Sequence, residues 1–98
     1  MSSELTARLE SSNIQVAAEA AEYTMFTRGI CLALVRRAPE GFTSLGSSGI
    51  MTEQGLAYLI WENGQPLLSS HGARLPASAV QVESIQQFSR DLKTALGL

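Results

Sequence analysis

The dipeptide Asn63-Gly64 constrains the fold of this chain more than any other feature of its sequence. Both central residues of a type I′ turn need positive φ angles, so the pair predicts a two-residue β-hairpin between apolar strands, the first at residues 56–61. Pro66 has no amide donor, so the second strand either begins there or exposes that side at a sheet edge. Residues 72–76, which begin with glycine and end with proline, predict a loop after it.

A second apolar stretch, residues 30–35, has no polar side chain on either face of a strand. This pattern predicts a central strand covered on both sides, although a buried helical segment has the same pattern. Pro39 and Gly41 suit the second and fourth positions of a β-turn, and the return strand is expected near residues 42–45. The small residues at 46–49 then form a bulge, a loop tip or a point of close backbone approach.

Helical patterns occur towards both ends of the chain. Residues 14–23 are rich in alanine and glutamate, and Ser12 followed by Gln15 fits a capping box, so a helix is expected there. The helix either starts at this cap or runs as one long element from near Ser3. If the helix starts at the cap, the first twelve residues are either disordered or form a short helix of their own.

The C-terminal segment predicts a helix because apolar residues recur three or four positions apart from Val82 to Leu96. Ser78 or Ser84 is its cap, since each has a glutamine three residues later, and Gly97 is its stop. The 98 residues therefore predict a single α+β domain. It has an N-terminal helix, a roughly four-stranded and mainly antiparallel sheet, and a C-terminal helix packed on the sheet.

The charge of the chain argues against nucleic acid and membranes as partners. The net charge is −2, and the longest basic run is Arg36-Arg37, whereas binding to phosphates needs a basic stripe. The element order resembles that of double-stranded RNA-binding domains, but the predicted C-terminal helix has no lysine or arginine before Arg90. We therefore expect no nucleic-acid and no membrane partner.

The single cysteine, Cys31, forms no internal disulfide and lies among apolar residues, so we expect it to be a buried small hydrophobe. Zinc-ligand spacing is absent, and we expect no metal and no cofactor. The chain also has no charged-then-apolar leader and no apolar run near about 18 residues. These features predict a soluble, cytoplasmic protein.

The stretch at residues 69–74 holds the only histidine and is the candidate ligand-binding segment. Its candidate residues are Ser69, Ser70, His71 and Arg74, which would form a rim for an anion or a polar ligand. The alternative interpretation is an exposed histidine in a loop. No residue is assigned a catalytic role, because adjacent serine and histidine do not make a catalytic pair.

Tyr58 and Trp61 are the candidate interface residues. They fall on opposite faces of their strand, so one should face the helices and the other solvent or a second subunit. Residues 56–61 carry no charge, and such a stretch must be an inner strand or pair with another chain. Charged residues are only 16% of the chain, which leaves the surface poorly protected against association.

These observations predict a small non-enzymatic binding or assembly module that acts as a homodimer or through a protein partner. The alternative is a domain that binds a small anion or metabolite in a pocket near His71 and Arg74, with weak acid–base activity.

Overall fold

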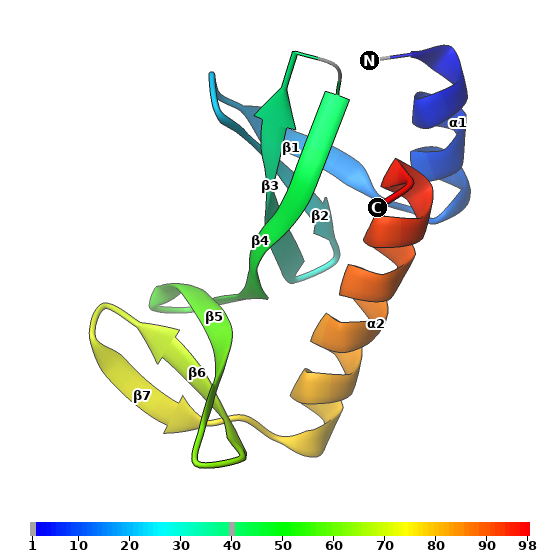
Figure 1. The fold of residues 1–98 in the computed structure, drawn as a ribbon. Helices are drawn as coiled ribbons and strands as arrows, with labels where there is room; N and C mark the ends of the chain where they lie inside the picture. The colour runs from blue at the N-terminus through cyan, green and yellow to red at the C-terminus, as the bar shows by residue number, and fades with distance from the viewer. Residues whose placement is uncertain (1, 40) are drawn as a thin grey trace.

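The structure is a computed structural model that describes residues 2–39 and 41–98. In this part of the chain two helices lie on one face of a single antiparallel sheet (Figure 1). The elements are α1 (Ser3–Ser11), β1 (Gln15–Glu19), β2 (Tyr23–Arg28), β3 (Cys31–Ala38), β4 (Gly41–Thr52), β5 (Gly55–Glu62), β6 (Gln65–Ser70), β7 (Ala73–Pro76) and α2 (Ala79–Leu96). The α+β class is as predicted, but the sheet has seven strands in sequence order instead of about four.

Two of the additional strands, β1 and β7, lie in segments that the sequence assigned to a helix and a loop, and the third, β2, begins where that predicted helix ends. Residues 14–23 are not helical, whether as a separate helix or as a continuation from Ser3, whereas the short helix within the first twelve residues is confirmed. Asn13 adopts a φ of 57° directly after α1, which turns the chain out of the helix. The alanine-rich segment after it pairs with β2 as an edge strand, so pairing overrides its helix propensity.

β3 is an inner strand of the sheet, as predicted, between β2 and β4, but the helices cover only one of its two faces. The expected return strand belongs to the long strand β4, but the proposed turn between Pro39 and Gly41 includes residue 40, which lies outside the described residues. Ala33 pairs with Ser48 and Val35 with Leu45, so β4 has one extra residue in this interval. The small residues at 46–49 therefore contain a β-bulge, one of the three predicted alternatives.

Two successive type I′-like turns connect β5, β6 and β7. Asn63 and Gly64 have φ angles of 52° and 76°, which confirms the predicted hairpin. His71 and Gly72 have φ angles of 48° and 81° and form the next turn, so the predicted loop at 72–76 is wrong and the chain pairs again as β7. Histidine is among the residues that tolerate this left-handed region.

Pro66 lies in an inner strand, so the prediction of a sheet edge is wrong. β6 begins one residue earlier, at Gln65, and the ladder between β6 and β7 ends at the pair Leu67–Pro76. The Pro66 carbonyl accepts a hydrogen bond from the amide of Ala77 at 3.1 Å. The missing amide of Pro66 lies on this same side, beyond the ladder, and therefore interrupts no strand pairing.

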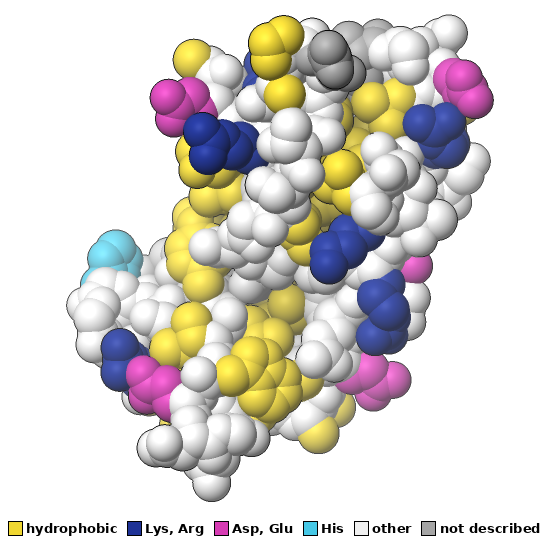
Figure 2. All heavy atoms as spheres, in the orientation of Figure 1, with side chains coloured by type: hydrophobic (Ala, Val, Ile, Leu, Met, Phe, Trp, Pro, Cys, Tyr) yellow, Lys and Arg dark blue, Asp and Glu magenta, His cyan; other side chains and the backbone are white. Residues whose placement is uncertain are grey.

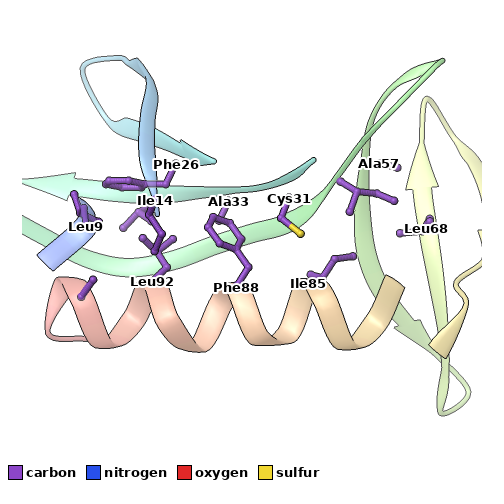
Figure 3. Packing of buried hydrophobic residues seen from close by; sticks show 13 residues of the cluster. Leu9, Ile14, Phe26, Cys31, Ala33, Ala57, Leu68, Ile85, Phe88 and Leu92 are labelled. Atoms are coloured by element: carbon purple, nitrogen blue, oxygen red, sulfur yellow. The ribbon is translucent and has the colours of Figure 1, made fainter. Parts of the chain in front are cut away.

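α2 covers one face of the sheet and supplies four of the thirteen buried residues of the core (Figure 3). Its capping box is confirmed at Ser78, the first of the two predicted caps, and Gly97 ends it with a φ of 74°. The buried residues of α2 are Ile85, Phe88, Leu92 and Ala95, which face buried residues of β2 to β6 and Leu9 of α1. Both helices lie on this same face, and Arg8 Nε of α1 donates to the Ala95 carbonyl at 2.9 Å.

Candidate functional site

The face of the sheet away from the helices, called here the outer face, is apolar across five strands. Strand register assigns to it one set of alternating side chains, because the other set packs beneath α2. Its apolar members are Met25, Leu32, Leu34, Met51, Leu56, Tyr58, Ile60 and Leu67. Antiparallel sheets that face water on one side normally carry polar residues there, so this face differs from a solvated surface.

Leu32 shows how strongly the outer face packs on itself. Leu32 pairs with Gly49 of β4, and Gly49 in turn pairs with Tyr58 of β5. The Leu32 side chain is only 2% exposed, although it does not belong to the buried cluster under α2. Neighbouring side chains of the same face therefore bury it. Figure 2 shows hydrophobic side chains along the left side of the molecule, beside a hollow above the turn that carries the histidine.

Charged side chains lie only towards the ends of the outer face in the described part of the chain. Arg36 stands near the end of β3, and Arg74 of β7 forms an ion pair with Glu62 of β5. The Arg74–Glu62 pair is partly exposed and contributes little to stability. The centre of the face is left without charge.

The two candidate interface residues lie on opposite faces, as strand alternation requires. Tyr58 is half-buried on the outer face. Trp61 lies on the helix side, where it is 53% exposed and lines an open groove of about 410 Å³ beside α2. The bulge of β4 forms the other wall of the groove, where Ser89 Oγ donates to Ser48 Oγ at 3.0 Å.

The four candidate ligand-binding residues do not converge on one rim. Ser69 and Arg74 pair across β6 and β7 on the outer face, where Arg74 is engaged with Glu62. Ser70 lines a pocket on the helix side, together with His71 of the adjoining turn. The sequence interpretation missed this division because it assigned residues 72–76 to a loop, in which strand alternation does not apply.

The pocket that contains Ser70 and His71, called here the β6–β7 pocket, has a volume of about 350 Å³. Its lining residues are Thr52, Gln54, Ala57, Leu68, Ser70, His71, Ala73, Leu75, Pro76 and Gln81. None of them is an acid, a lysine or an arginine. Ser70 Oγ is buried and has no hydrogen-bond partner among the described residues. Gln81 is partly committed, because its Oε1 accepts from the amide of Ser78 at 2.9 Å.

Arg28 is a structural residue that the sequence interpretation did not identify. Its Nη1 donates to Asp91 Oδ2 of α2 at 2.9 Å and to the Ser12 carbonyl after α1 at 3.1 Å. The guanidinium also lies over the Phe88 ring, 5.4 Å from the ring centre. Hydrogen bonds from Arg28 and then from Gln87 lower the pKa of Asp91. Arg28 thus joins both helices to β2.

Cys31 is buried beside Arg28, as the sequence indicated. Burial raises the pKa of its thiol, and the nearby charge of Arg28 opposes this effect without reversing it. A thiol with a raised pKa is a poor nucleophile, because the thiolate is the reactive form. The described geometry therefore favours a packing role for Cys31.

Two further features bear on the class of protein. No group of three or more histidine, cysteine, aspartate or glutamate side chains that could hold a metal ion occurs in residues 2–39 and 41–98. In the same residues no helix is long and apolar enough to cross a membrane.

Comparisons of the chain with protein-family models, curated proteins and solved structures found no match. The fold defines an α+β protein with a sequential seven-stranded sheet covered by helices on one face.

Proposed function

We propose that this chain is a non-enzymatic assembly module that forms a homodimer through the outer face of its sheet. The observation that carries the proposal is the apolar, uncharged centre of that face, which spans β2 to β6. Apolar surface of this extent is favourable to bury against another surface, and large apolar patches mark interaction sites.

The charges around the outer face favour a second copy as the occupant. Glu62 and Arg74 neutralise each other, and Arg36 adds a charge near one end of β3. Two copies of this face therefore meet with little like-charge repulsion, whereas a strongly acidic or basic partner finds no matching charge at the centre.

The dimensions of the outer face set the expected strength of the dimer. Five strands about 4.8 Å apart, each with two or three outer side chains of which one to three are apolar, cover an area on the order of 450 Å². A standard interface buries about 800 Å² per partner, so these strands supply at most roughly half of it and the surrounding surface the rest. We expect a dimer that dissociates at micromolar concentrations.

Sedimentation velocity from about 1 to about 100 µM tests this proposal. The expected result is a concentration-dependent shift from monomer to dimer. Met51→Lys places a charge on the outer face and should abolish the dimer. Leu75→Lys is the matched control, because Leu75 is similarly exposed, at 59% against 51%, but lies on the helix side. A monomer throughout the range, or a dimer sensitive only to Leu75→Lys, would contradict the proposal.

The position of Arg74 restricts where the alternative function, binding of a small anion or metabolite near His71, could take place. Arg74 is engaged with Glu62 on the outer face, away from Ser70 and His71, so a small-anion rim made of all three residues has no support in this arrangement. A ligand near His71 has to bind in the β6–β7 pocket, which is mostly apolar.

A further inference from the structure

We propose that the β6–β7 pocket binds a small amphiphile: an uncharged apolar body with one hydrogen-bonding group that reaches Ser70. The inference is independent of the dimer, because the pocket lies on the helix side of the sheet and the outer face lies on the other. Its ligand class follows from three properties of the pocket: its lining, its unpaired hydroxyl and its volume.

The lining selects against charge and in favour of apolar groups. Ala57 and Leu68 form its floor and belong to the buried core, while Ala73, Leu75 and Pro76 form its wall along β7. No acidic, lysine or arginine side chain of residues 2–39 and 41–98 lines the pocket. Small-molecule sites commonly combine such a lining with a few polar groups that fix the orientation of the ligand.

Ser70 supplies the polar group. Its Oγ is buried without a hydrogen-bond partner among the described residues, and a hydroxyl left unpaired in this way destabilises the folded protein. Ser70 lines the pocket, so rotation about its Cα–Cβ bond would bring the buried Oγ to the pocket surface, where a ligand hydroxyl, amide or carbonyl would restore the missing hydrogen bond. Ser69, the preceding residue, faces the opposite side of the sheet and cannot do the same.

The turn at His71 and Gly72 fixes the edge of the β6–β7 pocket, called here its rim. His71 takes the first position of the two-residue turn with a φ of 48°, directly after Ser70, and its Nε2 lies close to Gly55. The rim is therefore fixed by strand pairing between β6 and β7 on one side and by β5 on the other. This arrangement forms the pocket before a ligand arrives and reduces the entropy lost on binding.

The volume limits the ligand to about a dozen non-hydrogen atoms. A pocket of about 350 Å³ is near the lower end of the range for ligand sites. Small groups occupy about 30 Å³ each in a condensed phase. Benzyl alcohol, toluene and benzoate fit within this limit and differ in the group that would meet Ser70.

Titration of the protein with these three probes, followed by amide NMR shifts, tests the inference. We expect benzyl alcohol to shift the resonances of residues around the pocket and to bind about fivefold more tightly than toluene, since one hydrogen bond is gained. Ser70→Ala should remove this difference between the two probes. Ser69→Ala is the matched control, on the same strand and the other face, and should preserve it.

A second variant tests whether the probes bind in the pocket without changing Ser70. Ala73→Phe on the exposed edge strand β7 should fill the pocket and weaken the binding of both benzyl alcohol and toluene. Preferential binding of benzoate that is lost in Arg74→Ala would overturn the inference in favour of an anion site. If the amide shifts of the residues around the pocket change with protein concentration in the absence of any probe, the occupant is a second copy of the chain. That result would also overturn the inference.

Discussion

Thr24 is the clearest case in which one side chain works against the stability of the fold. It is fully buried in β2, and its Oγ1 has no hydrogen-bond partner among the described residues. Valine has nearly the same shape and no hydroxyl, so Thr24→Val should increase the free energy of unfolding by about 1 kcal/mol. Urea unfolding measures this change, and Thr43→Val, at an exposed position of β4, is the control. A loss of stability would show that the hydroxyl has a partner in solution.

Asp91 should make stability depend on pH in the acidic range. Because Arg28 lowers its pKa in the folded protein, the ionised carboxylate stabilises the fold above the unfolded pKa of about 3.9. This contribution is lost as the pH falls through the lower, folded pKa. Unfolding measured between about pH 2 and pH 6 should therefore show a weaker pH dependence for Asp91→Asn than for the wild type.

The same carboxylate can be observed directly, since Asp91 is the only aspartate in the chain. Carbon NMR of the carboxyl groups should show one aspartate that titrates below its ordinary pKa. In Arg28→Ala this pKa should rise, whereas Glu83→Gln leaves it unchanged. An Asp91 that titrates identically with and without Arg28 would contradict the proposed ion pair.

At the scale of the elements, Gly49 determines how β4 and β5 meet. A Cβ atom at this position would lie 1.9 Å from the Ala57 carbonyl oxygen, which is a backbone atom that cannot rotate away. Gly49→Ala should therefore force β4 and β5 apart and lower the free energy of unfolding by about 3 kcal/mol. Ser47→Ala, two residues earlier on the same strand, should change it little. Wild-type stability in Gly49→Ala would mean that the two strands separate more easily than the structure indicates.

Elements specified by local chemistry could be predicted from the sequence. The Asn63-Gly64 turn and the cap at Ser78 depend on backbone angles and hydrogen bonds within a few residues, and both are confirmed. β1 could not be predicted in this way, because its residues favour a helix and become a strand only by pairing with β2. Its signal was Asn13, whose side chain tolerates the left-handed angle that ends α1.

The candidate site was partly predictable for the same reason. Ser70 and His71 do line a pocket, whereas Arg74 lies on the other face. A spacing of eight residues separates Asn63-Gly64 from His71-Gly72, as a two-residue turn followed by a six-residue strand requires. Recognition of this repeat would have assigned residues 73–76 to a strand and separated Arg74 from Ser70 by alternation.

For the whole molecule, the proposed dimer links stability to concentration. Dimerisation stabilises the folded state by mass action, so the thermal midpoint should rise between about 2 µM and about 200 µM protein. Met51→Lys should remove this dependence, and Leu75→Lys should retain it. Identical midpoints at both concentrations for the wild type would contradict self-association of the folded chain.

The sequential order of the sheet also has a consequence for how the chain reaches its fold. Every strand lies beside the one that precedes it, so each pairing closes a short loop, which favours rapid formation of the ladder. α2 (Ala79–Leu96) follows all seven strands, so a chain emerging from the ribosome exposes the apolar inner face of the sheet until the residues of α2 are synthesised. We expect this interval to be when the nascent protein most needs a chaperone.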